Sequence, residues 1–307
     1  MNLQSETFTD RPLRFFIPPR DARGRVVRLD KSLEQILSAH TYPPQIEALL
    51  AEALVLTALL GSSLKDAGGQ LTLQAQTQAG VIKLLVCDFK DGALRGYVQF
   101  DEEKVAALPE DATLFALFGE GYLAITFDRE KKSAHDDGRY QGIVPLEGNS
   151  LSEATELYFV QSDQIPTLIR VGIDRRGGKT VRAGGIMLQH LPQGEEGRER
   201  LHVRTNHEEW DHIEALAGSI TDDELTDTDL PLEEIVWRLF HEEDEVRIEE
   251  GKGLSRGCRC DESHIRDVIS RFPATERDDM ADDTGNIAVN CEFCSRSFPI
   301  SLNSLSD

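Results

Sequence analysis

The cysteines of this 307-residue chain are concentrated near its end, and they constrain its fold more than any other residue type. Four of the five lie within 37 residues. Cys258 and Cys260 form a C-x-C pair, and after 30 intervening residues Cys291 and Cys294 form a C-x-x-C pair. Two close pairs of this kind are typical of structural zinc sites, in which four thiolates surround one ion as a tetrahedron. The spacing therefore predicts one Zn²⁺ ion per chain, bound by these four cysteines.

Two other residues are weaker candidates for a role in this site. His264 follows Cys260 by four residues and could replace one ligand, but we expect it to face solvent on a helix. We expect Ser263 to cap that helix at its N-terminus and Pro273 to end it. Cys87 lies in an apolar segment far from the cluster, which predicts a buried small hydrophobic side chain and not a reactive thiol.

The cysteine-rich segment depends on its metal, because residues 254–300 offer few large apolar side chains for a core. Structural zinc contributes about 10–16 kcal/mol to such units, so losing it should unfold the segment. Thiolates are also attacked by peroxide and hypochlorous acid, and oxidised sulfur is a poor ligand. After zinc release, neighbours are best placed to form disulfides, Cys258 with Cys260 and Cys291 with Cys294. A C-x-C disulfide closes a small strained ring and is easily reduced, which predicts a reversible switch.

The formal net charge is -22, and most of it belongs to one segment. Residues 195–250 hold 20 acidic and 5 basic side chains. Nucleic acids and anionic membranes recruit Lys and Arg, so the acidic excess argues against both as partners. No apolar run approaches the roughly 18 residues of a spanning helix, and residues 1–10 lack the order of a signal peptide. We therefore expect a soluble cytoplasmic protein.

The acidic segment also contains apolar residues at helical spacing, including Trp210 and Ile213. Its clearest predicted helix spans 230–243, with Asp229 as the N-cap and Pro231 in the first turn. One face of this helix is apolar and should dock on a partner surface. The far end places four acids against the negative pole of the helix dipole, at a cost of about 0.3–1 kcal/mol each. These acids are Glu242, Glu243, Asp244 and Glu245. The pattern predicts a docked but marginally stable linker.

The residues before the acidic segment predict a mixed domain of helices and strands. A largely buried helix is expected over 43–65 and a second helix over 152–164. Alternating or continuous apolar runs predict strands over 70–77, 81–89, 94–100, 121–127, 140–146 and 166–173. We therefore expect an α+β protein with antiparallel pairings. Its predicted parts are an N-terminal core over 1–184, a metastable acidic helical linker over 185–250 and a small zinc-binding domain over 251–307.

Particular stretches identify a resemblance. The run RLFHEEDEVRI (238–248) precedes the two cysteine pairs. Before it come, in order, LLAEALVLTALLGSSLK (49–65), GQLTLQAQ (69–76), GYLAITF (121–127), YQGIVPL (140–146), ELYFVQSDQIPT (156–167) and AGGIMLQHLP (183–192). Over roughly residues 10–300, these stretches and the cysteines resemble the heat-shock protein 33 family, which consists of bacterial redox-regulated holdase chaperones.

The resemblance implies a mechanism in which the reduced, zinc-bound protein is inactive. Oxidation of the four cysteines would expel zinc, unfold the linker and expose surfaces that hold unfolding client proteins without ATP during oxidative stress. The active form would be a homodimer, with the core domain binding clients. By position, the zinc-ligand and redox-sensor roles fall on Cys258, Cys260, Cys291 and Cys294. Beside this implication, we expect the charge of the linker to keep the opened protein soluble.

Two other functions fit the cysteines less well. A constitutive zinc-ribbon binding module would need a basic patch for nucleic acid, and the chain lacks one. A thiol-disulfide oxidoreductase usually places its C-x-x-C motif at a helix N-terminus, whereas here the motif follows the strand-like run 286–290. The chain also lacks the G-x-S-x-G, Walker A and G-x-G-x-x-G motifs. We therefore expect a protein that is not an enzyme.

Overall fold

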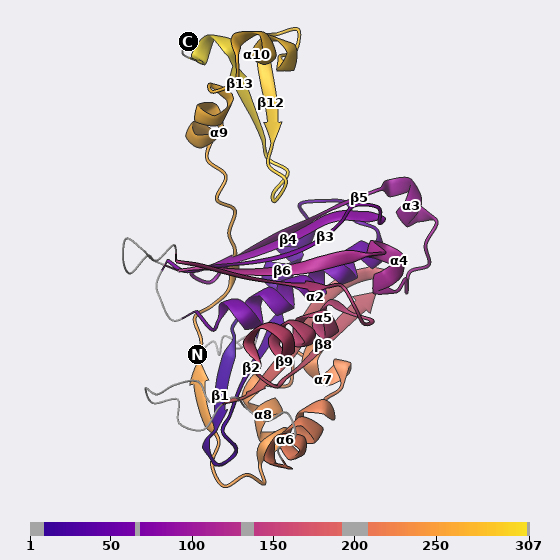
Figure 1. Ribbon diagram of the computed structural model, residues 1–307, viewed down its shortest axis with the longest axis vertical. Coiled ribbons are helices and arrows are strands. Elements are labelled where there is room, and N and C mark those ends of the chain that lie inside the picture. The colour runs from indigo at the N-terminus through magenta and orange to yellow at the C-terminus, as the bar shows by residue number, and fades with distance from the viewer. Residues whose placement is uncertain (1–8, 65–67, 130–137, 192–207, 306–307) are drawn as a thin grey trace, which may run out of the picture.

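A computed structural model describes residues 9–64, 68–129, 138–191 and 208–305. Two β-sheets enclose a central helix, short helices cover the outer face of one sheet, and a C-terminal unit follows an extended segment and reaches back to the other sheet with one turn (Figure 1). The architecture is the predicted α+β arrangement. Residues 192–207, inside the predicted linker, lie outside the described residues.

The larger sheet has six strands in the order β11-β5-β4-β3-β6-β7. All neighbouring strands are antiparallel except β11, which runs parallel to β5. Inward apolar residues alternate with outward ones along β3 as the sequence predicts, because successive side chains point to opposite faces. The strands are β3 (Gln70–Thr77), β4 (Ile82–Lys90), β5 (Ala93–Phe100), β6 (Gly121–Asp128), β7 (Arg139–Pro145) and β11 (Ser255–Arg256).

The smaller sheet has five antiparallel strands in the order β10-β1-β2-β9-β8. Its strands are β1 (Leu13–Ile17), β2 (Ala22–Leu29), β8 (Thr167–Arg176), β9 (Lys179–His190) and β10 (Arg247–Glu250). The predicted domain boundary between residues 184 and 185 falls inside β9. Gly184 and Gly185 lie within that strand. They are glycines because a Cβ atom would collide with the Leu225 carbonyl at the first position or with the Val55 side chain at the second.

The central helix, α2 (Pro44–Gly61), packs against both sheets. Its length and mean hydropathy match those of a membrane-spanning helix, but 78% of it is buried inside the fold. Leu50 and Leu54 are among its fully buried side chains, in one core with Leu73 and Ile125 of the larger sheet. The predicted second helix is α5 (Leu151–Tyr158), followed by a π-helical turn at Phe159–Asp163. The other α-helices in the described residues of the N-terminal part are α1 (Lys31–Leu37), α3 (Glu102–Ala106) and α4 (Leu114–Phe118).

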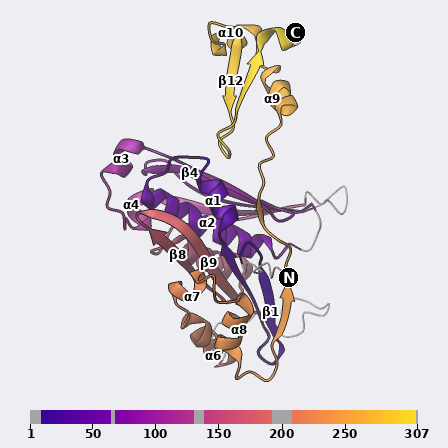
Figure 2. The same cartoon turned by 180° about the vertical axis from the view of Figure 1, so that it is seen from behind.

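Residues 208–240, in the described part of the acidic linker, form three helices on the face of the smaller sheet opposite α2 (Figure 2). They are α6 (Glu208–Gly218), α7 (Asp222–Thr226) and α8 (Leu232–Phe240). Trp210, Ile213 and Phe240 are buried against this face, and the Phe240 ring lies 5.4 Å from that of Phe15. Trp237 instead remains 60% exposed. Pro231 itself is the N-cap of α8, so the prediction of Asp229 at that position is wrong.

Arg28 of β2, which is fully buried, joins the smaller sheet to the linker helices. Its Nε donates to the Leu225 carbonyl at 2.8 Å, its Nη1 to Leu230 at 2.9 Å and its Nη2 to Glu224 at 3.0 Å. These oxygens lie at the C-terminal end of α7 and in the turn before α8, where carbonyls lack helical partners. A cation at this pole is also favourable for the helix dipole. Arg28 therefore supports the turn that connects the linker helices.

The expected repulsion at the end of the last linker helix is only partly correct. The helix α8 ends at Phe240, so the four acids lie beyond its last turn. The Glu243 side chain is 3% exposed and accepts from Arg20 at 2.8 Å, while His212 Nε2 lies 3.0 Å from its other oxygen. Glu245 pairs with Arg247 on the surface. Glu243 thus ties the end of the linker to the core instead of loosening it.

Replacing Glu243 by Gln should therefore weaken linker docking in the reduced protein. Loss of the partly buried ion pair should cost about 1–3 kcal/mol, measurable as faster amide exchange in α6 and α8. The matched control is Glu242→Gln, because Glu242 is exposed and surface changes stay within about 0.5 kcal/mol. A Glu243→Gln protein as stable as the wild type, or more stable, would instead support the original expectation that these acids only repel one another.

The C-terminal unit contains the antiparallel pair β12 (Asn286–Asn290) and β13 (Ser297–Ser301) with the helices α9 (Glu262–Ile269) and α10 (Ala274–Met280). Its core is small, as the composition predicts. The buried members are Ile269, Ile287, Phe298 and Ile300. Asp261 caps α9 by accepting from the Ser263 backbone N–H, so the predicted cap at Ser263 is displaced by two residues.

Candidate metal centre

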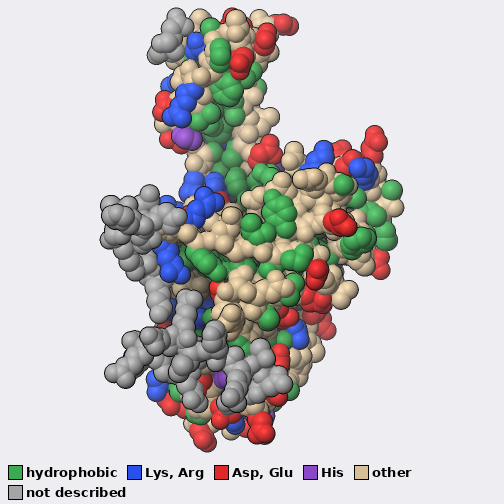
Figure 3. Space-filling model, in the orientation of Figure 1, with side chains coloured by type: hydrophobic (Ala, Val, Ile, Leu, Met, Phe, Trp, Pro, Cys, Tyr) green, Lys and Arg blue, Asp and Glu red, His purple; other side chains and the backbone are tan. Residues whose placement is uncertain are grey.

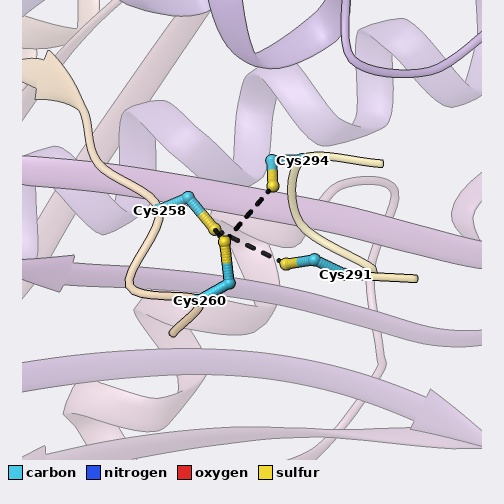
Figure 4. A group of neighbouring side chains, drawn as sticks. All are labelled: Cys258, Cys260, Cys291 and Cys294. Atoms are coloured by element: carbon cyan, nitrogen blue, oxygen red, sulfur yellow. Dashed lines mark hydrogen bonds between the residues drawn. The ribbon is translucent and has the colours of Figure 1, made fainter. Parts of the chain in front are cut away.

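The four C-terminal cysteines meet at one point (Figure 4). Cys258 and Cys260 lie in the extended segment between β11 and α9, and Cys291 and Cys294 lie in the turn between β12 and β13. Sγ–Sγ distances are 3.4 Å for Cys258–Cys260, 3.5 Å for Cys258–Cys291 and 3.6 Å for Cys260–Cys294. All four sulfurs lie within 4.8 Å of one another. The fold therefore brings the two predicted pairs together.

This cluster has the geometry of a metal site. Four sulfurs bound to Zn²⁺ at about 2.3 Å form a tetrahedron with edges of about 3.8 Å, close to the distances observed. A set of four thiol ligands is also the donor chemistry that zinc prefers. His264 is exposed on α9 and is not a member of the cluster. The four cysteines are thus a group that could hold a metal ion.

The turn that carries the second pair is shaped by its backbone. The Cys291 carbonyl accepts from the N–H groups of Cys294 at 3.3 Å and Ser295 at 2.8 Å, and the Cys291 N–H donates to Arg296 at 2.9 Å. Ser295 adopts a left-handed conformation with φ of 56°, which reverses the chain into β13. These bonds point both sulfurs of the pair to one side, because two residues separate them on a tight turn.

The four thiols differ in acidity. Burial disfavours the Cys258 thiolate, but hydrogen bonds from the Cys260 backbone and the neighbouring thiols outweigh it and lower the pKa of Cys258 to about 7. Burial and the nearby Cys258 raise the pKa of Cys260 to about 12 and also raise the pKa of Cys291. Crowded sulfurs resist holding four negative charges together without a cation. Cys87 is fully buried and burial raises the pKa of its thiol, as predicted for a structural cysteine.

The loop that joins Cys291 to Cys294 rests on the larger sheet. Phe293 meets Tyr97 edge to face at a centroid distance of 4.9 Å, and the Arg95 guanidinium lies 3.9 Å from the Phe293 ring. Next to the first pair, Arg259 donates to Asp88 at 3.0 Å. These contacts place the cysteine cluster against β4 and β5.

One further contact secures the loop. The Ser295 hydroxyl lies 3.1 Å from His40 Nδ1. The sequence did not point to the four residues of the N-terminal part that form this docking site, namely His40, Asp88, Arg95 and Tyr97. The available signal was the identity of the residues between the ligands, since Arg259 and Phe293 are chemically suited to a carboxylate and an aromatic ring.

Comparison with known proteins decides which family this fold and cysteine cluster represent. The family model described as Hsp33 protein matches residues 10–301. The chain belongs to the Hsp33 family. It is 39% identical over 293 residues to the 33 kDa chaperonin of Caulobacter vibrioides, covering 93% of each protein. It is 34% identical over 285 residues to the 33 kDa chaperonin of Shewanella loihica, covering 93% of this chain and 90% of that protein.

A solved Hsp33 structure supports the same fold. The 33 kDa chaperonin of Thermotoga maritima, a heat shock protein 33 homolog, superposes with a TM-score of 0.77. It covers 96% of both chains at 20% sequence identity. This chain is therefore a member of the Hsp33 chaperone family whose four clustered cysteines could hold a metal ion.

Proposed function

We propose that this protein is a redox-regulated, ATP-independent holdase. The observation that carries the proposal is that one chain joins a cluster of four cysteines to linker helices whose apolar faces are buried on the smaller sheet. The strands β10 and β11 connect the two features, since β10 follows the linker helices and β11 leads directly to Cys258. A change in the cluster can therefore reach the linker through a short continuous segment.

The chemical step is the oxidation of the two cysteine pairs, Cys258 with Cys260 and Cys291 with Cys294. In each pair, two thiolates lose two electrons as one S–S bond forms, and one peroxide molecule accepts these electrons and two protons from the solvent to give two water molecules. Both pairs together consume two peroxide molecules. When bound, one Zn²⁺ ion per chain would supply a positive charge that holds four thiolates together. Disulfide sulfurs do not provide that ligand set.

The consequence for the fold follows from the small core of the C-terminal unit. Without four thiol ligands the unit loses its main source of stability, and its contacts to β4 and β5 through Phe293 and Arg259 are lost. Release of β10 then removes the strand that follows the linker. When the linker helices leave the smaller sheet, apolar residues on both sides of that interface become exposed, including Phe15 and Phe240. Such surfaces bind the apolar segments that unfolding proteins expose.

The linker charge has a separate role in this proposal. Acidic side chains gather on the linker helices at the lower end of the molecule (Figure 3). Their mutual repulsion keeps the opened form and its bound client in solution. We further propose a cytoplasmic location, a homodimer in the oxidised state, and no nucleic-acid, membrane or catalytic role.

The test compares reduced and peroxide-treated protein for suppression of light scattering by a chemically unfolded client. We expect suppression only after treatment and its reversal by dithiothreitol. A Cys87→Ser variant is the matched control, because Cys87 lies outside the cluster and should leave activation unchanged. Equal suppression before and after treatment would contradict redox control. Rapid insulin reduction by the protein with dithiothreitol would instead support the oxidoreductase alternative.

A further inference from the structure

The outer face of the six-stranded sheet carries a small aromatic site that the C-terminal unit occupies. This face points away from α2, and the turn between β12 and β13 lies over its β5 edge. Phe293 is the side chain from the turn that enters the site. The Tyr97 ring meets the Phe293 ring edge to face, and the Arg95 guanidinium lies against the Phe293 ring. Both are favourable partners for any aromatic side chain.

The site does not depend on the C-terminal unit for its shape. The Arg95 guanidinium is held by Asp88, to which its Nε donates at 2.8 Å and its Nη2 at 2.6 Å. Asp88 is 3% exposed and also accepts from the Thr72 hydroxyl at 2.7 Å. All of these residues belong to β3, β4 and β5. Arg95 therefore keeps its position when Arg259 and Phe293 leave.

On the sheet face beside this site, one row of side chains that runs across the strands from β5 to β7 contains no charged residue. Strand register aligns Tyr97 with Val86, Val86 with Gln74, Gln74 with Ala124, and Ala124 with Ile143. Ile143, at the far end of this row, is 58% exposed. A row without charges is notable on a chain whose net charge is -22. Hydrophobic side chains also lie over this sheet in the space-filling view (Figure 3).

We propose that this outer face is a client-binding surface and that the Arg95–Tyr97 site takes an aromatic side chain of a non-native polypeptide. Phe293 occupies the site in the closed form and acts as an internal substitute for the client. This inference rests on the proposed holdase function and specifies its substrate class. The partner is an uncharged, apolar segment containing Phe, Tyr or Trp. An anionic partner does not fit, because Asp88 already neutralises Arg95.

The first test uses the oxidised, zinc-free full chain, in which the turn has left the site. Binding of a fluorescent apolar peptide with a central Phe is compared with binding of the same peptide carrying Leu. Tyr97→Leu removes the ring but keeps an apolar side chain, and Arg95→Lys keeps the charge opposite Asp88. Each should weaken Phe-peptide binding about three- to tenfold and leave Leu-peptide binding nearly unchanged. Phe115→Ala, which removes a 68% exposed aromatic ring on α4, is the matched control and should bind both peptides normally.

The second test uses the reduced, zinc-loaded protein and does not depend on oxidation. Phe293→Ala empties the site without altering a cysteine, so the variant should bind the Phe peptide while its zinc content stays that of the wild type. Glu292→Ala, beside it on the same turn, should behave like the reduced wild type and not bind. Gain of Phe-peptide binding by Phe293→Ala alone supports the internal substitute.

The outcomes separate this inference from the proposed function. If the oxidised wild type neither binds peptide nor suppresses aggregation, the holdase function itself fails. If the oxidised wild type does both, but Tyr97→Leu and Arg95→Lys bind the Phe peptide equally well, the aromatic site is overturned and the holdase function stands. Binding of the Phe peptide by reduced Glu292→Ala as strongly as by reduced Phe293→Ala would also overturn the site.

Discussion

Removal of zinc from the reduced protein should unfold residues 258–305 and leave both sheets of the N-terminal part folded. Within residues 258–305, which the structure describes, the buried hydrophobic core of the C-terminal unit consists of four side chains, whereas structural zinc contributes about 10–16 kcal/mol to such units. Without the ion, the raised pKa values of Cys260 and Cys291 keep these two thiols protonated near neutral pH, so the cluster then holds fewer than four thiolates. Chelation under reducing conditions, followed by amide exchange of β12 and β13, measures the effect.

Replacing Cys291 by Ser should reproduce the effect of chelation, because it removes one of four ligands. His264→Ala is the matched control, since His264 is exposed and should leave both zinc content and folding unchanged. A C-terminal unit that stayed protected from exchange after complete zinc removal would show that its small core is sufficient. The metal would then not be the structural element that oxidation removes.

Replacing Arg28 by Met should open the linker in the reduced, zinc-loaded protein and produce chaperone activity without an oxidant. The substitution keeps most of the side-chain volume but leaves three carbonyl oxygens of Glu224, Leu225 and Leu230 without their donor. Hydrogen bonds from a charged group contribute about 1.5–3 kcal/mol each. Burial also lowers the pKa of Arg28 to about 10, so part of this gain is offset. We expect the free energy of linker docking to weaken by about 2–5 kcal/mol, which is measured as faster proteolysis near α7.

Arg25, on the same strand, provides the control for this substitution. It is 7% exposed, and its Nε and Nη1 atoms have no hydrogen-bond partner among the residues that the structure describes. Burial and the nearby charges of Arg23 and Arg14 lower the pKa of Arg25 to about 9. Arg25→Met should therefore leave the linker docked and the protein at least as stable. If Arg28→Met and Arg25→Met were equally inactive when reduced, Arg28 would not hold the linker.

Local patterns predicted the features that depend on local chemistry. The ligand spacing predicted that Cys258 and Cys291 belong to one cluster. The alternation of apolar and polar residues predicted β3 at its observed bounds. The long apolar run predicted α2 because a buried helix is apolar on most sides. These elements are specified by residues close in sequence, so a single chain is enough to find them.

Pairings between distant segments were not predictable in the same way. β10 and β11 are short and polar, and they are strands only because β1 and β5 offer free edges. The predicted domain boundary fell between Gly184 and Gly185, although both glycines lie inside β9 and allow neighbouring elements to approach it closely. Glu243 was expected to repel its neighbours, since Arg20 and His212 approach it only in the folded chain.

The most direct test of the account is amide exchange of residues 208–240 in the reduced protein and in the oxidised, zinc-free protein. Opening of the linker on oxidation predicts slow exchange in α6 and α8 of the reduced form and fast exchange in the oxidised form. β3 and α2 should remain protected in both forms, because their core lies on the other side of the smaller sheet. Protected linker helices in an oxidised protein that suppresses aggregation would contradict the account.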